Sequence, residues 1–119
     1  MWEIDLYEKA NGRCPVQEFL DGLNKKTDLP FIDRTRKLLS EKGYALGRPY
    51  VAYLRDDIYE LRVRTRNGQF RILYFFYDRG TIVFTNGLHK KGEKTPDPAI
   101  DQAIEYRVDY LRRKEEQKK

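Results

Sequence analysis

The stretch that decides the fold runs from Asp57 to Pro96 and reads DIYELRVRTRNGQFRILYFFYDRGTIVFTNGLHKKGEKTP. Three segments of it, at about 58–66, 69–77 and 81–88, show the two-residue alternation of β-strands. Asn67-Gly68 is the strongest short hairpin signal in the chain, and Asp78-Arg79-Gly80 supplies a second turn. The stretch therefore predicts a three-stranded antiparallel meander that opens onto a basic loop.

The flanking segments predict one more strand and three helices. Residues 2–7 alternate as a half-buried strand, and Pro15 suits the first turn of a helix over about 15–26. Asp28 is a capping residue for a second helix that ends at Gly43, and residues 50–54 form a loop or a short extended piece. Thr95 is expected to cap, and Pro96 to begin, the last helix. The predicted order is βααβββα, a single α+β domain over residues 1–119 whose antiparallel sheet is packed by two N-terminal helices and a C-terminal helix.

Composition and charge limit the range of possible functions. The formal net charge is +5 and the sequence pI is about 9.3, a balance that favours nucleic acid as a partner. One cysteine excludes an internal disulfide and a thiolate zinc cluster, and one histidine leaves no histidine-rich site, so neither a metal nor a cofactor is expected. Without a visible signal peptide or a membrane-spanning apolar run, we expect a cytoplasmic protein with no membrane partner.

The strand pattern predicts a basic face. A two-residue turn at Asn67-Gly68 would place Arg64 opposite Arg71 and Arg62 opposite Leu73. Like charges directly across a strand pair cost roughly 0.2–1 kcal/mol unless an anion lies between them. One interpretation is that Glu60, another acidic group or solvent relieves this repulsion; the other is that Arg62 or Arg71 grips a phosphate with two parallel hydrogen bonds. The opposite face is predicted to be core, with Tyr59, Leu61, Val63, Phe70, Ile72, Tyr74 and Phe76.

The loop after the last predicted strand adds Lys90, Lys91 and Lys94 beside those arginines. A lone run of lysines is more often a solvated loop, but this one leaves the same sheet. His89 is a further polar candidate, and Tyr53 is a candidate for stacking on a splayed base. The chain has no glycine-rich phosphate loop and no evident carboxylate cluster for two magnesium ions. If it cuts a phosphodiester, RNA is the natural substrate, because the 2′-OH can attack the adjacent phosphate without a metal.

Several of these segments together carry a family resemblance. Residues 57–62 (DIYELR), 70–76 (FRILYFF), 88–91 (LHKK) and 94–96 (KTP), with Ile100 to Ala103 and Arg107 beyond, resemble the HigB branch of the RelE/ParE toxin superfamily. The resemblance covers most of the chain and is strongest from Ile58 to Leu111. The ordered set is more specific than any one piece.

The resemblance implies a RelE/ParE-like toxin that cleaves mRNA on the translating ribosome and binds a cognate helix-turn-helix antitoxin. Carried over by position, Arg62, Arg71, Lys91 and Lys94 would be catalytic, and Arg64, Lys90, His89 and Tyr53 would bind RNA. Which group acts as base and which as acid stays open. Two alternatives remain: a ParE-type toxin that inhibits gyrase, and a non-catalytic module that binds protein or RNA.

Overall fold

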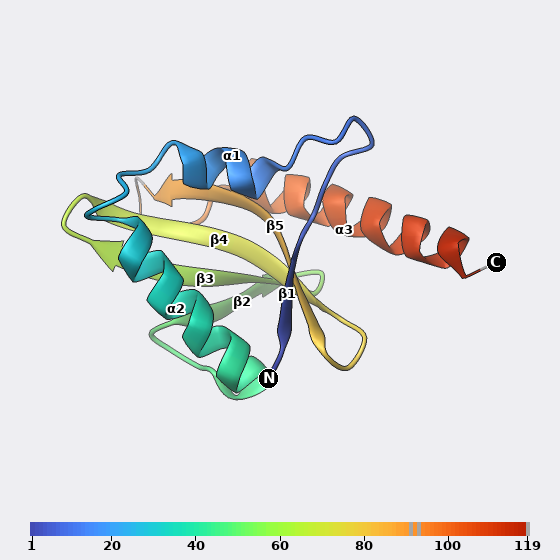
Figure 1. Cartoon of the computed structure of the whole chain (residues 1–119), viewed down its shortest axis with the longest axis horizontal. Helices are drawn as coiled ribbons and strands as arrows, with labels where there is room; N and C mark the ends of the chain where they lie inside the picture. The colour runs from blue at the N-terminus through green and yellow to red at the C-terminus, as the bar shows by residue number, and fades with distance from the viewer. Residues whose placement is uncertain (91, 93, 119) are drawn as a thin grey trace.

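A five-stranded sheet forms the centre of the fold in the computed structural model, which describes residues 1–90, 92 and 94–118 (Figure 1). The strand order is β1-β5-β4-β3-β2, and neighbours are antiparallel except for β1 and β5, which are parallel. The elements are β1 (Glu3–Leu6), α1 (Pro15–Asp21), α2 (Leu29–Lys42), the 3-10 turn η1 (Gly43–Ala45), β2 (Val51–Arg55), β3 (Ile58–Thr65), β4 (Gly68–Tyr77), β5 (Thr81–Lys90) and α3 (Asp97–Gln117). The mixed α+β class is confirmed, whereas the wholly antiparallel sheet is wrong because β1 runs parallel to β5.

The strand that the pattern does not predict is β2, at one edge of the sheet. It has only five residues, too few for a clear alternation. It is joined to β3 by Asp56 and Asp57, which have φ values of 51° and 66°. Aspartate adopts this left-handed conformation more readily than most residues, but an Asp-Asp pair does not signal a hairpin as Asn-Gly does. Because its pairing with β3 starts at Val51 opposite Leu61, the end of β3 that approaches Thr65 lies at the sheet edge.

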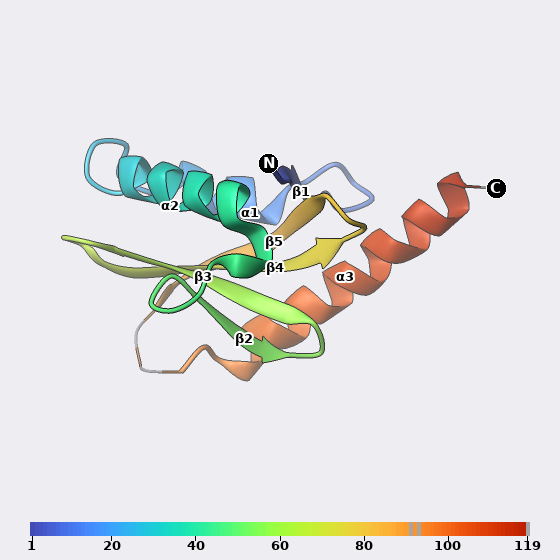
Figure 2. The same ribbon diagram turned by 90° about the horizontal axis from the view of Figure 1, so that it is seen from below.

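Helices α1 and α2 cover one face of the sheet, and α3 covers part of the other (Figure 2). The first face carries the core residues Val16, Ile32, Leu39, Leu61, Ile72, Tyr74, Ile82 and Phe84; the second carries Ile58, Leu73, Phe75, Val83, Ile100, Ala103, Tyr106 and Tyr110. In Figure 2 the β3–β4 hairpin extends well beyond the end of α3. The second face is therefore uncovered by α3 near that hairpin. In the described ranges, no helix combines the length and the apolar character that a bilayer crossing requires.

Strands β3 and β4 pair two residues away from the predicted register. The hairpin closes with Arg66-Asn67 as its two-residue loop rather than with Asn67-Gly68. The observed pairs include Thr65–Gly68, Arg64–Gln69, Arg62–Arg71 and Glu60–Leu73. Gly68 has φ of 129°, and a β-carbon there would lie 2.6 Å from Nε2 of His89, so the glycine is needed beside the loop. A shift of two residues leaves every side chain on its predicted face.

Strand β5 contains a β-bulge. Thr85 and Asn86 together lie opposite Leu73, so one residue of β5 is extra at this point. The buried hydroxyl of Thr85 donates a hydrogen bond to the carbonyl oxygen of Leu73 (3.0 Å). Beyond the bulge, Lys90 lies opposite Gln69 on the α3 face and His89 lies opposite Phe70 on the α1/α2 face.

Two tyrosine–aspartate hydrogen bonds fasten α3 to the N-terminal strand. Tyr7 donates to Asp109 (2.6 Å) and Tyr110 donates to Asp5 (2.8 Å). The Tyr7 hydrogen bond, supported by two arginines of α3, lowers the pKa of Asp109 to about 2. Burial, followed by the bonded carboxylate, raises the pKa of Tyr7 to about 12.

The lowered pKa of Asp109 predicts a loss of stability in acid. A carboxylate whose folded pKa is lowered stabilises the fold above its unfolded pKa near 4, and this contribution disappears as the pH falls through about 2. We expect Asp109→Asn to lower the free energy of unfolding by about 1 kcal/mol at neutral pH, because the group is only partly buried and is screened by solvent. Urea unfolding from neutral pH to about pH 2 should show this gap closing, with Asp33→Asn as the exposed control. A gap that does not depend on pH would contradict the assigned pKa.

Candidate functional site

The predicted arginines gather on the α3 face of the sheet at the end of the β3–β4 hairpin. Alternation along β3 puts Glu60, Arg62 and Arg64 on this face, and Arg71 reaches it from β4. The register sets Arg62 directly opposite Arg71. The predicted pairing of Arg64 with Arg71 is therefore wrong, and the like-charged pair across the two strands is Arg62 with Arg71.

Glu60 neutralises part of this charge from within the sheet. Its Oε2 accepts hydrogen bonds from Nε of Arg62 (2.8 Å) and from Nη1 of Arg71, and its Oε1 accepts one from the Thr95 hydroxyl. Side-chain exposure is 1% for Glu60, 3% for Arg71 and 31% for Arg62. Burial lowers the pKa of Arg71, as does the neighbouring Arg62, while the Glu60 carboxylate opposes the shift. We call these four residues the Glu60 cluster; they correspond to the interpretation in which a carboxylate relieves the arginine repulsion.

Thr95 has a different role from the predicted one. Its side chain makes no cap hydrogen bond to α3; Pro96 occupies the N-cap position, with extended backbone, and the helix begins at Asp97. The buried Thr95 hydroxyl donates to Glu60 instead. The acceptor is a buried carboxylate, and a hydrogen bond to a charged acceptor is stronger than one between neutral groups. Thr95 thereby fastens the segment before α3 to the strand arginines.

Replacing Thr95 with valine should lower the free energy of unfolding by about 1.5–3 kcal/mol, the usual contribution of a hydrogen bond to a charged group. The two side chains have the same shape, so the change isolates the hydroxyl. Thermal and urea unfolding measure the effect, and Thr81→Val provides the same substitution at a partly exposed strand position. An equal, small loss in both variants would show that the Thr95 hydroxyl contributes nothing.

A cavity of about 690 Å³ lies beside the Glu60 cluster, around the edge of β3. Its lining comes from α2, the segment before β2, β3, β4 and β5: Phe31, Arg34, Thr35, Pro49, Tyr50, Arg62, Val63, Arg64, Gln69, Arg71 and Lys90. Five of these described residues are cationic and none is a carboxylate. The buried Nε of Arg71 has no hydrogen-bond partner among the described residues. We call this hollow the basic cavity; its charge and its donors suit an anion.

Two exposed aromatic rings line the basic cavity and were not predicted as site residues. Phe31 is 42% exposed with the Arg34 guanidinium 5.3 Å from its ring centre, and Tyr50 is 43% exposed. The signal for Phe31 was its position: a large apolar residue beside, rather than on, the α2 face that carries Ile32 and Leu39. Exposed rings beside arginines are what unpaired bases stack on.

The structure brings only part of the predicted site together. Arg62, Arg64, Arg71 and Lys90 line the basic cavity. Lys94 is exposed and directly precedes Thr95, but it does not line the cavity, and Lys91 lies outside the described residues.

His89 and Tyr53 lie away from the basic cavity. The His89 ring stacks on Phe70 at 4.7 Å on the α1/α2 face of the sheet, because the bulge at Thr85 reverses the alternation that would bring it to the arginines. The ring of Tyr53 contacts Tyr59 near the Asp56-Asp57 turn, at the other end of β3. The structure therefore does not bring these two residues together with the arginines. In the part of the chain that the structure describes, no group of three His, Cys, Asp or Glu side chains is arranged to hold a metal ion.

Comparison with family models connects this geometry to known proteins. The model described as Phage derived protein Gp49-like (DUF891) matches residues 18–108. The match extends from α1 into α3 and includes the whole Glu60 cluster and every residue lining the basic cavity. A search of curated proteins found no match.

Proposed function

The chain belongs to the Gp49-like family of phage-derived proteins, and from that premise we propose that it is the toxin of a type II toxin–antitoxin system, an endoribonuclease of the HigB kind that cleaves mRNA on the ribosome. Family membership is compatible with a toxin of such a system. The observation that supports the RNA activity is the basic cavity, where five cations and two exposed rings line one hollow. Cations for the phosphate and rings for the bases are the two requirements of single-stranded RNA binding.

In this proposal Arg62 and Arg64 contact the scissile phosphate. Glu60 holds Nε of Arg62, which leaves the end of that guanidinium directed at a ligand, and Arg64 is exposed. Arg71 is too buried to bind the phosphate in the same way. In this proposal it contributes a fixed positive charge beneath the cavity, and its Nε has no hydrogen-bond partner among the described residues. Preorganised donors of this kind stabilise the extra negative charge of the phosphorane.

The proposed reaction needs no outside reactant. The 2′-oxygen of the RNA attacks the adjacent phosphorus, the bond from phosphorus to the 5′-oxygen breaks, and a 2′,3′-cyclic phosphate remains. One group removes the proton of the 2′-OH and another delivers a proton to the leaving 5′-oxygen. We assign proton transfer or charge stabilisation to Lys94 and Lys91; Thr95, the residue after Lys94, is hydrogen-bonded to Glu60.

The proposed protein partner is a cognate helix-turn-helix antitoxin. An acidic or amphipathic segment of it would be complementary to the basic cavity and would prevent RNA from entering. The wild-type toxin is expected to stop growth, so we expect its gene to lie next to the gene of its antitoxin.

The decisive experiment is a short induction of the wild-type chain in cells, followed by mapping of new mRNA 5′ ends. We expect new ends within translated regions and none in untranslated RNA, together with unchanged supercoiling by purified gyrase. Gyrase inhibition without new ends would replace the proposal with the ParE-type activity. Growth without either effect would refute the toxin activity.

A second candidate is a non-catalytic RNA-binding module, and one observation favours it. Both guanidinium groups predicted to be catalytic, those of Arg62 and Arg71, are held by one internal carboxylate. Purified protein that binds single-stranded RNA tightly but never cleaves it, with or without ribosomes, would establish this candidate.

A further inference from the structure

Asp28 and Glu60 are the two buried carboxylates of the described residues, and only Glu60 belongs to the Glu60 cluster. Asp28 is 3% exposed and occupies the N-cap position of α2. Its backbone carbonyl accepts the first hydrogen bonds of the helix, from the amides of Phe31 and Ile32 (3.2 Å each), but its side chain makes no cap hydrogen bond. The side chain that the sequence predicts to cap α2 is therefore used elsewhere.

The Asp28 carboxylate holds the tip of the β3–β4 hairpin. Its Oδ1 accepts hydrogen bonds from the Thr65 hydroxyl (2.6 Å) and from Nδ2 of Asn67 (3.1 Å), which are 37 and 39 residues away along the chain. The side-chain amide of Asn67 also donates to the Thr27 hydroxyl (2.8 Å), and the backbone amide of Asn67 donates to the Thr65 hydroxyl (3.1 Å). These four residues, which we call the Asp28 clamp, join the segment before α2 to the loop between β3 and β4 (Figure 1).

The Asp28 clamp is built around a charge that burial alone would disfavour. Burial raises the pKa of Asp28, but the hydrogen bonds from Thr65, Asn67 and the Asn24 backbone amide outweigh it, so the pKa lies below its usual value. A buried carboxylate depends on each of its donors, because a lost donor leaves the charge poorly solvated. The hairpin loop and the start of α2 are therefore held in one arrangement.

Each side of the Asp28 clamp leads directly into one wall of the basic cavity. On α2, Phe31 follows Asp28 by three residues and lines the cavity with its exposed ring. On the hairpin, Arg64 immediately precedes Thr65 and lines the cavity from β3. The clamp therefore joins the element that carries the stacking ring to the element that carries the cation.

We propose that Asp28 is a positioning residue of the basic cavity, which sets the spacing between the Phe31 ring, where a base would stack, and the Arg64 guanidinium, where a phosphate would bind. The base and the phosphate of one nucleotide are covalently linked, so both contacts form together only if the two walls keep their spacing. Asp28 itself is buried, does not line the cavity and touches no RNA. This inference rests on the proposed function, because it takes RNA as the ligand of the cavity.

Thr65→Val tests the proposal, because it removes the hydroxyl of the shortest hydrogen bond to Asp28 and keeps the shape of the side chain. Binding of the purified protein to a short single-stranded RNA is measured by fluorescence anisotropy at fixed salt, at a temperature where unfolding curves show every variant to be folded. We expect Thr65→Val to bind about tenfold more weakly than the wild type, the effect of losing much of one base-stacking contact. Thr65→Ser, which keeps the hydroxyl, should restore the wild-type affinity.

An abasic oligonucleotide of the same length separates positioning from charge. It keeps the phosphates but offers no base to Phe31, so Thr65→Val should bind it as tightly as the wild type does. Phe31→Ala should weaken binding of the normal RNA, and adding Thr65→Val should weaken it little further, because the ring that the Asp28 clamp positions is already gone. Fully additive losses from the two substitutions would contradict the proposal.

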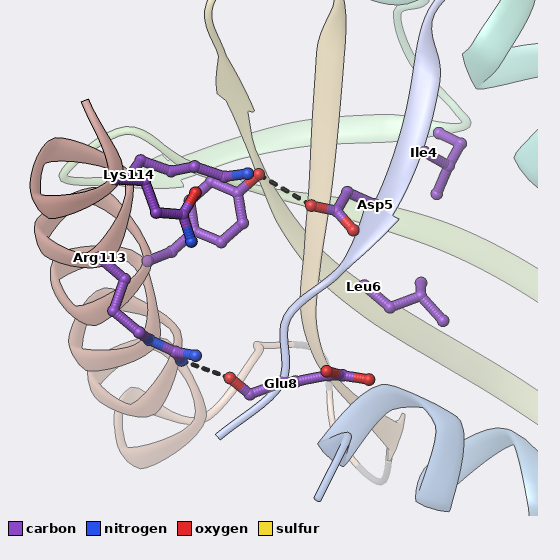
Figure 3. Close-up of a pocket in the computed structure, with 8 residues that line it drawn as sticks. Ile4, Asp5, Leu6, Glu8, Arg113 and Lys114 are labelled. Atoms are coloured by element: carbon purple, nitrogen blue, oxygen red, sulfur yellow. Dashed lines mark hydrogen bonds between the residues drawn. The ribbon is translucent and has the colours of Figure 1, made fainter. Parts of the chain in front are cut away.

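Tyr110→Phe is the matched control for a loss of stability. It removes the hydroxyl that donates to Asp5 (2.8 Å), a hydrogen bond to a carboxylate between α3 and β1 (Figure 3). Neither residue lines the basic cavity. This control should lower the free energy of unfolding and keep the wild-type RNA affinity. An equal loss of affinity in Tyr110→Phe would overturn the proposal, as would wild-type affinity in Thr65→Val.

A second measurement tests the proposal without RNA. The backbone amide resonances of Phe31 and Arg34 in the NMR spectrum should shift in Thr65→Val and return in Thr65→Ser, because the hairpin loop and the start of α2 are held together. Unchanged resonances of these two residues in Thr65→Val would overturn the proposal. A wild-type chain that binds neither oligonucleotide would refute the proposed function, and the resonances alone would then decide whether the Asp28 clamp fixes the spacing of the cavity walls.

Discussion

Glu60→Ala should lower the free energy of unfolding by about 3–5 kcal/mol, the largest loss expected of any single substitution considered for this chain. Removing the carboxylate leaves Arg71 buried and charged with no counter-charge, directly opposite Arg62. Arginine cannot escape this cost by losing its proton. Thermal and urea unfolding measure the loss, with Glu41→Ala as the control at an exposed position of α2.

A double variant tests the cause of that loss. Glu60→Leu with Arg71→Met removes both buried charges, and replacement of a buried ion pair by apolar side chains is often neutral or stabilising. We therefore expect the double variant to recover most of the stability that Glu60→Ala loses. A loss below about 1 kcal/mol in Glu60→Ala would mean that solvent reaches Arg71 and that the cluster is not a buried one.

Arg62→Ala should reduce the rate of mRNA cleavage by about 10²–10³-fold, the usual effect of deleting one donor that stabilises a transition-state oxyanion. The side chain is partly exposed and lines the basic cavity, so the fold should tolerate its loss better than the loss of Arg71. The measurement is single-turnover cleavage of a defined message in a reconstituted translation reaction. Because this prediction depends on the proposed function, it follows the detection of wild-type cleavage.

The matched control is Arg79→Ala, which removes the same charge from the exposed β4–β5 turn. It changes net charge equally, so any general weakening of ribosome binding appears in both variants. A comparable reduction in both would mean that the chain uses overall charge and not the basic cavity. Unfolding curves for each variant separate a loss of activity from a loss of fold.

The faces of the hairpin were predictable from sequence because alternation is insensitive to a two-residue error. The sequence predicts the two-residue loop one residue further along the chain than the structure has it. Glu60, Arg62, Arg64 and Arg71 nevertheless all lie on the expected face. The core of β3 and β4 followed for the same reason. Local chemistry at the turn fixes the exact register, and Gly68 proved to be the residue after the loop rather than within it.

The rest of the candidate site depends on contacts between distant segments. Nothing near Thr95 indicates that its hydroxyl bonds Glu60, 35 residues earlier, rather than the start of its own helix. Phe31 comes to the basic cavity from α2, and Tyr50 comes to it from the segment before β2. Such features are set by packing, and alternation within one segment carries no information about them.

The extra residue at Thr85 has a consequence for how such sites diversify. An unbulged β5 in the same pairing would bring an imidazole to Gln69 and the basic cavity, whereas the bulged strand brings the ammonium group of Lys90. The presence of one extra residue in β5, held by a threonine hydroxyl, thus determines which of two functional groups faces the basic cavity, although the residues of the strand stay the same. Related chains with near-identical strand sequences can therefore carry different chemistry if they differ only in whether this kink is kept.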